Sequence, residues 1–143
     1  MITVQHVLNT KAIHVYSVTE STSVLDGLKM MTEKNISALL IMENESLLGI
    51  FTERDYARKV NLKGRSSNTT AIKEVMTPNP ITITMDTHID ECMSIMSSKK
   101  IRHLPIVDGD EMIGVISIGD VVRFTIEEQK GIIEQLEHYI TNH

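Results

Sequence analysis

Residues 49–55 read Gly-Ile-Phe-Thr-Glu-Arg-Asp, and residues 114–120 read Gly-Val-Ile-Ser-Ile-Gly-Asp. Both stretches have the pattern Gly-x-x-(Ser/Thr)-x-x-Asp and lie 65 residues apart. Around them, segment 18–60 aligns on segment 83–125 without a gap, with ten identities in 43 positions. A match of this length indicates an internal duplication, and two copies favour a closed pair over an open solenoid.

Each copy predicts the same order of elements: strand, helix, strand, strand, helix. The first helix of each copy carries apolar residues at i, i+4 and i+7, beginning at Val24 and at Ile89. Capping-box spacing places the starts of these helices at Ser23 and at Thr87. The expected strands are residues 13–18, 38–42 and 47–51 in the first copy and 81–83, 104–107 and 112–116 in the second.

The resulting fold class is α/β (α+β), with two pseudo-symmetric repeats that pack together because one copy alone has too little core. We expect the second helix of each copy to begin near Asp55 or Asp120. The last of these helices should stay helical to about residue 140. The predicted domains are residues 1–65, residues 66–125 and a C-terminal helical extension over 126–143.

Composition excludes several classes of protein. Of the 143 residues, 14 are Lys or Arg and 19 are Asp or Glu, so the net charge is −5, and Trp is absent. A nucleic-acid binder is usually basic and offers aromatic stacking platforms, so no nucleic-acid partner is expected. A single Cys suits a reducing compartment, and no apolar run or basic leader predicts a membrane span or a signal peptide. We therefore expect a cytoplasmic protein.

The repeated Gly-x-x-(Ser/Thr)-x-x-Asp pattern has two interpretations. In the first, the hydroxyl and the amides of the helix N-terminus bind phosphate, and the Asp carboxylate accepts hydrogen bonds from two ribose hydroxyls. In the second, Thr52 and Asp55 only cap a helix. The presence of two copies, each following a strand, favours ligand binding.

The chain resembles a tandem pair of CBS domains, the Bateman module. The resemblance covers essentially residues 1–143 and rests on the two Gly-x-x-(Ser/Thr)-x-x-Asp motifs, on Val-Met-Thr-Pro at 75–78 and on Ile-Arg-His-Leu-Pro-Ile-Val-Asp at 101–108. The resemblance implies a regulatory energy or redox sensor without catalytic residues. It also implies an adenine nucleotide as ligand: AMP, ADP or ATP, with NAD or S-adenosylmethionine in some members.

The resemblance also implies two crossed sites, each combining the Asp of one copy with strand residues of the other. The first would contain Thr52, Arg54, Asp55, Thr77, Ile81, Arg102 and His103. The second would contain Lys11, Tyr16, Ser37, Ala38, Ser117, Gly119 and Asp120. Arg54, Arg102 and His103 make the first set more basic, so we expect it to prefer the phosphorylated ligand.

Local charge supports an anionic ligand independently of the resemblance. Residues 54–73 contain six basic side chains and one acidic side chain, Asp55, within an acidic protein. Lys63 and Arg65 are candidate contacts for a phosphate tail. The alternative is a solvated helix face, which is what charge runs usually are.

Apolar residues along 121–140 are too many for one CBS pair to bury, so we expect a homodimer that acts on a regulated protein of unknown identity. An alternative function is therefore a structural interaction or dimerisation module with vestigial clefts. An enzyme is not expected, because no nucleophile–base pair, metal-ligand spacing or complete phosphate-transfer motif is present. Cys92 has no visible base to activate it.

Overall fold

The computed structural model describes residues 1–141, which form two compact units. Unit 1 consists of residues 1–13, 82–108 and 113 onwards, and unit 2 consists of residues 14–81 and 109–112. The two units are described separately below. The N-terminal 13 residues belong to the same unit as most of the second repeat. The boundaries of the two repeats stay predictions, because compact units and repeats divide the chain differently.

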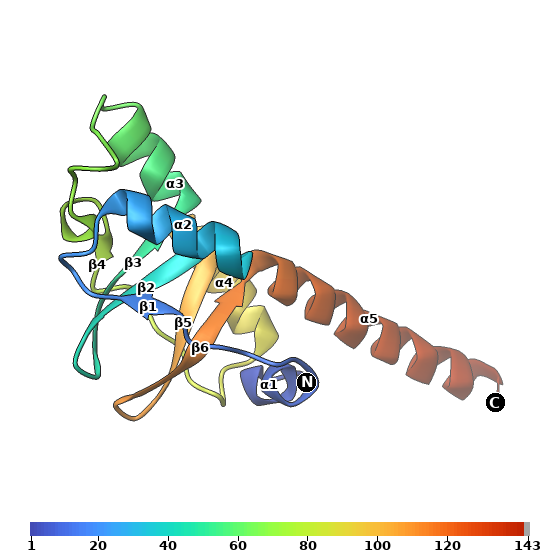
Figure 1. Ribbon diagram of the computed structural model, residues 1–143. Helices are drawn as coiled ribbons and strands as arrows, with labels where there is room; N and C mark the ends of the chain where they lie inside the picture. Colours follow the sequence, from blue (N-terminus) through green and yellow to red (C-terminus); the bar gives the residue numbers. More distant parts are fainter. Residues whose placement is uncertain (142–143) are drawn as a thin grey trace. The chain divides into compact units, whose positions relative to one another are not determined.

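Unit 2 is a four-stranded sheet with helical segments (Figure 1). Its elements are β1 (Ser17–Val18), α2 (Val24–Lys34), β2 (Ala38–Glu43), β3 (Ser46–Thr52), α3 (Glu53–Asp55), the π-helix η1 (Tyr56–Asn61), the 3₁₀-helix η2 (Ile72–Glu74) and β4 (Thr77–Pro78). The strand order is β1-β2-β3-β4, with β1 parallel to β2 and the other pairs antiparallel. The core joins the apolar face of α2 to the sheet through Val24, Met31, Leu39, Ile41 and Phe51.

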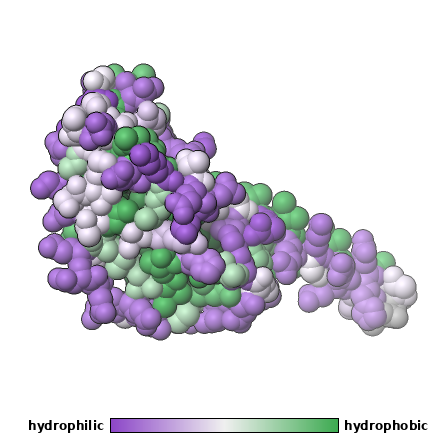
Figure 2. All heavy atoms as spheres, viewed as in Figure 1, coloured by the Kyte–Doolittle hydropathy of each residue, from purple (hydrophilic) through white to green (hydrophobic). Residues whose placement is uncertain are grey.

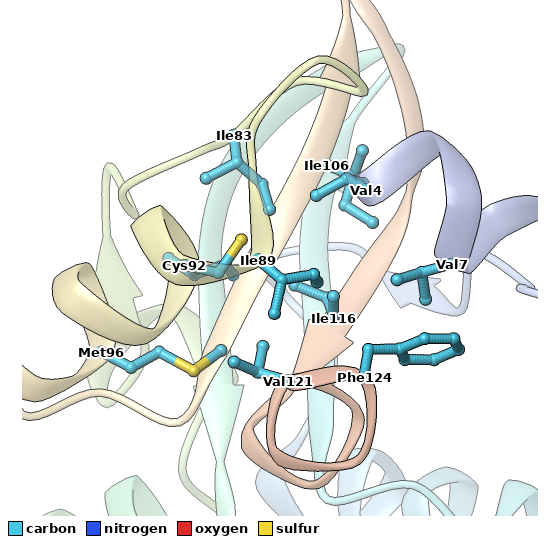
Figure 3. Packing of buried hydrophobic residues seen from close by; sticks show 11 residues of the cluster. Val4, Val7, Ile83, Ile89, Cys92, Met96, Ile106, Ile116, Val121 and Phe124 are labelled. Carbon is cyan, nitrogen blue, oxygen red and sulfur yellow. The ribbon is translucent and has the colours of Figure 1, made fainter. Parts of the chain in front are cut away.

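Unit 1 contains α1 (Val4–Thr10), α4 (Ile89–Lys99), β5 (His103–Asp108), most of β6 (Glu111–Ser117) and α5 (Ile118–Thr141). Strands β5 and β6 pair, and Ile83 makes a parallel bridge to Ile106. Figure 3 shows the core of this unit, in which side chains from α1, α4, β5, β6 and the first turns of α5 pack together. Val4, Val7, Ile106 and Ile116 are fully buried there.

The predicted order of strands and helices is confirmed, with four local differences. First, the strands before α2 and α4 are shorter than expected, since β1 covers only Ser17–Val18 and its counterpart is the single bridge at Ile83. Second, Ser23 caps α2 through a 3.1 Å hydrogen bond from the backbone N–H of Asp26, but Thr87 does not cap α4. The Thr87 hydroxyl accepts the backbone N–H of Thr84 instead.

The third difference is that α3 and α5 begin two residues before Asp55 and Asp120, with Glu53 and Ile118 as their first residues. Each motif Asp is therefore the third residue of its helix. The fourth is that three short elements, α1, η2 and β4, were not predicted.

Helix α5 has 24 described residues, and its first turns alone reach the core. Val121 and Phe124 are buried, whereas every residue from Ile132 to Thr141 is exposed. Residues 142–143 of the expected C-terminal extension lie outside the described residues. Within residues 1–141, no helix is long and apolar enough to cross a membrane.

Candidate functional site

The first motif ends in a reciprocal hydrogen-bonded cap at the start of α3. The Thr52 hydroxyl accepts the backbone N–H of Asp55 at 3.1 Å, and Asp55 Oδ2 accepts the backbone N–H of Thr52 at 3.0 Å. The other carboxylate oxygen, Oδ1, accepts the Thr77 hydroxyl at 3.1 Å and faces Lys59 Nζ at 3.0 Å. One oxygen of this buried carboxylate therefore accepts a backbone hydrogen bond, and the other meets two side chains, Thr77 and Lys59.

The second motif repeats this cap at the start of α5. Asp120 Oδ2 accepts the backbone N–H of Ser117 at 3.1 Å and the Ser117 hydroxyl at 3.0 Å. Asp120 Oδ1 meets two cations, Lys11 Nζ at 2.6 Å and Arg123 Nη2 at 2.8 Å. The Asp120 side chain is 5% exposed, whereas those of Lys11 and Arg123 are 42% and 60% exposed. Asp120 is therefore a buried carboxylate that faces two partly exposed cations.

The environment of Asp120 favours its charged form. Burial raises the pKa of this carboxyl, but the hydrogen bond from Lys11, those from Ser117 and the charge of Lys11 outweigh burial and hold the pKa below its usual value. Asp120 is therefore an acceptor of hydrogen bonds at neutral pH.

The motif glycines serve packing within the chain. A Cβ on Gly49 would lie 2.8 Å from the backbone oxygen of Thr77 and 2.6 Å from Met76 Sδ. A Cβ on Gly114 would overlap Cγ2 of Ile13. In each repeat the glycine thus admits a neighbouring segment, which brings Thr77 to Asp55 and Lys11 to Asp120. The space beside each motif glycine is therefore occupied by the protein's own segments.

The profile of the CBS domain family matches residues 4–61 and 72–127, one match for each repeat. The chain belongs to the CBS domain family. It contains two CBS domains in tandem, as the sequence motifs predicted.

Individual CBS proteins are similar over most of this chain. The mitochondrial CBS domain-containing protein CBSX3 of Arabidopsis thaliana is 40% identical over 85% of the chain and 62% of its own length. A putative signal-transduction protein with CBS domains from Burkholderia ambifaria has a TM-score of 0.85 and 44% identity, over 90% of this chain and 96% of that one. The crystal structure of CBSX2 in complex with AMP has a TM-score of 0.71 and 27% identity, over 90% and 99% of the two chains.

The chain spans less than two thirds of the first curated CBS relatives that it matches: 62% of CBSX3 and 22% of the next one. CBSX3 is described as mitochondrial, so the cytoplasmic location expected from the sequence stays a prediction.

Three other residues taken over from the CBS resemblance, Ser37, Ala38 and Arg102, lie next to the motif of their own repeat. The carbonyl of Ser37 accepts the backbone N–H of Glu53 at 3.2 Å, and the carbonyl of Arg102 accepts that of Ile118 at 2.8 Å. Ala38 is the register partner of Thr52 in the β2–β3 ladder. Because Ser37 and Arg102, like Glu53 and Ile118, are 65 positions apart, the two CBS repeats share this contact.

The remaining predicted residues fall into different parts of the CBS pair. Unit 1 contains Arg102, His103 and Gly119, and unit 2 contains Arg54, Tyr16 and Ile81. Within unit 1 the structure brings Lys11, Ser117 and Asp120 together, and within unit 2 it brings Thr52, Asp55 and Thr77 together. The crossed combinations implied by the resemblance stay predictions.

The two residues suggested for a phosphate tail have different surroundings. Arg65 Nη2 makes an exposed ion pair with Glu74 at 2.9 Å, and Glu74 also accepts the backbone N–H of Ala71. That backbone hydrogen bond, together with Arg65, lowers the pKa of Glu74. Lys63 is exposed in the turn after η1. Their role in binding stays a prediction.

Sequence reasoning did not assign Lys59 or Arg123 to either site. Both follow a motif Asp by one helical turn, Lys59 at i+4 from Asp55 and Arg123 at i+3 from Asp120. This spacing places side chains on the same helix face and could have identified both residues. Lys59 is the cation that pairs with Asp55, and Lys11 and Arg123 are the cations that pair with Asp120. Both clusters therefore contain cations.

Two further features bear on catalysis, potential metal ligands and the Cys92 thiol. Among residues 1–141, no group of three or more His, Cys, Asp or Glu side chains could hold a metal ion. Cys92 is buried, and burial together with the charge of Glu91 raises the pKa of its thiol to about 11. The thiol is therefore protonated at neutral pH, which makes it a poor nucleophile.

Proposed function

We propose that this CBS pair is a regulatory module that binds an adenosine-containing nucleotide and carries no catalytic centre. AMP, ADP and ATP are the first candidates and NAD is the next. The proposal rests on one observation: the two carboxylate oxygens of Asp55 have different partners. Oδ2 caps α3, while Oδ1 faces the Thr77 hydroxyl and Lys59 Nζ.

The geometry around Asp55 Oδ1 suits a ribose. Lys59 is 42% exposed, so its ammonium group can leave Oδ1 at little cost, and a ribose hydroxyl can replace it as donor. The displaced ammonium group would remain within reach of a phosphate. The Thr52 hydroxyl lies beside the same carboxylate, with 3.2 Å between its oxygen and Asp55 Oδ2, and offers a second polar group to a ribose.

Asp120 offers the same arrangement in the second repeat. Its Oδ1 has two cations in place of one cation and one hydroxyl. We propose Asp55 with Thr52, and Asp120 with Ser117, as the ribose-binding pairs of the two repeats. The AMP bound by CBSX2, a protein with a TM-score of 0.71 and 27% identity to this chain, supports the choice of an adenosine ligand.

Regulation follows from mass action in this proposal. A ligand that binds the folded pair and not the unfolded chain stabilises the fold, and it shifts any equilibrium in which the bound pair has a different affinity for a partner. The partner would be a protein whose activity depends on the level of the nucleotide. The nucleotide itself would be released unchanged.

Calorimetric titration with AMP, ADP, ATP and NAD tests the proposal. At least one should bind with a dissociation constant below millimolar, and Asp55→Ala should weaken that binding roughly ten- to 150-fold, the effect of losing a hydrogen bond to a charged group. Asp110→Ala, in the exposed turn between β5 and β6, serves as the matched control. If none of the four binds, or if Asp110→Ala weakens binding as much as Asp55→Ala, the proposal is wrong.

The exposed apolar residues of α5 favour a second candidate function, a homodimeric interaction module. Ile132, Ile133 and Leu136 are 51%, 54% and 57% exposed, although each is a residue type that cores usually bury. In such a module the clefts would be vestigial. One measurement separates it from a nucleotide sensor: whether partner binding changes when nucleotide is present at a saturating concentration.

A further inference from the structure

Residues 122–140 of α5 carry a seven-residue repeat in which five of six positions are apolar. Written as a heptad, the a positions are Ile126, Ile133 and Ile140, and the d positions are Val122, Gln129 and Leu136. All six lie within one uninterrupted helix, and all six are exposed. We call these six residues the α5 seam. A repeat of 3.5 residues between apolar positions is the pattern of a coiled coil.

The α5 seam faces away from the core of unit 1. The residues of α5 that contact this unit occupy other heptad positions: Asp120, Val121 and Phe124 are buried, and Glu128 accepts the backbone N–H of Ile2. On the seam side, a shallow hollow extends along the helix and is lined in part by Gly119, Val122, Ile126 and Lys130. Figure 2 shows apolar side chains on the visible side of α5. The helix thus uses one face for its own core and leaves the other face open.

We propose that the α5 seam binds the same seam of a second copy in a parallel, in-register, two-stranded coiled coil. The proposal deepens the self-association suggested above and does not depend on nucleotide binding. Ile occupies all three a positions, and Leu136 occupies one of the three d positions. β-Branched residues at a, combined with Leu at d, favour parallel pairs of helices over larger bundles. A second copy is the occupant because it supplies the identical heptad at matching spacing.

The polar residue within the seam favours the parallel orientation. In register, Gln129 faces Gln129 of the second copy, so it can form a hydrogen bond across the seam. An antiparallel pair of the same length would place Gln129 against Ile133. Its e positions would bring the two copies of Lys130 together but would also bring each Arg123 to Glu137 of the second copy. Gln129, and not charge, therefore favours the parallel orientation.

In the parallel pair, the charged e positions Arg123, Lys130 and Glu137 face the g positions of the second copy. These g positions are Thr125, Ile132 and Tyr139, and none of them is charged. No like charges meet in this orientation.

Light scattering on the full chain tests the association. We expect the wild type to be a dimer at tens of micromolar and Ile133→Lys to raise the dimer dissociation constant by roughly 100-fold or more, since two buried isoleucines are lost per dimer. Gln135→Lys, two residues further along on an outer c position, should stay dimeric. Circular dichroism should show an unchanged fold in both variants, because Ile133 is 54% exposed and Gln135 is exposed as well.

Disulfide trapping tests the orientation. Ile140→Cys should oxidise to a covalent dimer by itself, because parallel pairing places position 140 opposite position 140. In the antiparallel pair these positions would lie about 27 Å apart, far beyond the reach of a disulfide. Gln135→Cys, on the outer face, should remain monomeric on a non-reducing gel and also reports any reaction of native Cys92.

Three results would overturn the inference, and none of them bears on nucleotide binding. A monomeric wild type would remove both the coiled coil and the proposed self-association. A dimer that survives Ile133→Lys unchanged would keep the self-association and exclude the α5 seam. A mixture of Val122→Cys and Ile140→Cys proteins that links into mixed dimers, while Ile140→Cys alone does not, would establish the antiparallel orientation instead.

Discussion

The clusters at Asp55 and Asp120 were built by one duplication, and they differ in a single respect. Both carboxylates use Oδ2 to cap the helix that follows the motif, and both sit beside a glycine that admits a neighbouring segment. At Oδ1, however, Asp55 has one cation and a neutral hydroxyl, whereas Asp120 has two cations. The two repeats therefore share the helix cap at Oδ2 and differ in the side chains that contact Oδ1.

This difference separates the structural part of each motif from the part that can vary. The capping oxygen is constrained by backbone N–H groups that have no other partner at a helix start. The outer oxygen faces mobile side chains that come from a different segment or from the next helical turn. The comparison therefore predicts similar responses where the two repeats share a contact and different responses where they do not.

The largest effect is expected from Gly49→Ala and Gly114→Ala. Both substitutions test a feature that the two repeats share, the close approach of a neighbouring segment to the motif glycine. Both should lower the free energy of unfolding by about 1–3 kcal/mol or more, because a Cβ would have no room. Gly49→Ala should cost more, since its Cβ would meet a backbone oxygen at 2.8 Å, whereas that of Gly114 would meet an isoleucine methyl. Urea denaturation in the Ile133→Lys background measures both without a contribution from the dimer.

Gly131→Ala is the matched control, because its Cβ would have no atom within 4 Å and the residue lies inside α5. This substitution should stabilise the helix by about 0.5–1 kcal/mol. If Gly49→Ala behaves like Gly131→Ala, the close approach of residues 76–77 is not needed for folding.

The next effect separates the two carboxylates. Asp120→Asn removes a charge that faces two cations and should cost about 2 kcal/mol, while Asp55→Asn should cost about 1 kcal/mol because a neutral hydroxyl supplies half of its outer contacts. Both values are free energies of unfolding at neutral pH. If the two variants lose equal free energies of unfolding, the contribution of each carboxylate to stability comes from the cap at Oδ2 and not from the partners of Oδ1.

Sequence periodicity could predict the elements that both repeats share, but not the contacts between distant segments. Strands β2, β3, β5 and β6 follow from apolar runs bounded by turn residues. Helix α1 does not, because its seven residues offer only Val4 and Val7 as buried positions, and its first amides bond to the carbonyls of Thr87 and Met85. Those carbonyls are some 80 positions away in the chain.

The candidate site could be predicted from the sequence where it depends on the repeated motif, but not where it depends on contacts between distant segments. The motif positions Thr52, Asp55, Ser117 and Asp120 follow from the repeat, as does the helix start beside them. The placement of Lys11 came from the family resemblance, and the ion pair with Asp120 depends on the packing of residues 1–13 into the unit that contains α5. A local pattern contains no information about packing between such distant segments. It does predict that Arg123 and Lys59, at i+3 and i+4 from their motif Asp, lie on the same helix face as that Asp.

A pH series sharpens the comparison at Asp120. Its pKa in the folded protein is lowered, so Asp120 stabilises the fold at pH values above its unfolded pKa of about 3.9, and this contribution is lost as the pH falls through the lower folded pKa. The difference in unfolding free energy between the wild type and Asp120→Asn should therefore be constant from pH 7 to pH 5. It should shrink on further acidification towards pH 3. A difference that grows over that range would contradict the ionised state assigned to this carboxylate.

The smallest expected effect is the coupling between the two cations of Asp120. Lys11→Met or Arg123→Met alone should cost only about 0.2–1 kcal/mol, because each cation is partly exposed and the other remains at Oδ1. The double variant leaves a carboxylate that is 5% exposed without any cation, so its cost should exceed the sum of the single costs by about 0.5–1 kcal/mol. Lys59→Met serves as the comparison in the other cluster. It removes the cation that forms an ion pair with Asp55. Strict additivity at Asp120 would show that its two cations act independently. The difference between the repeats would then lie in the number of contacts and not in their cooperation.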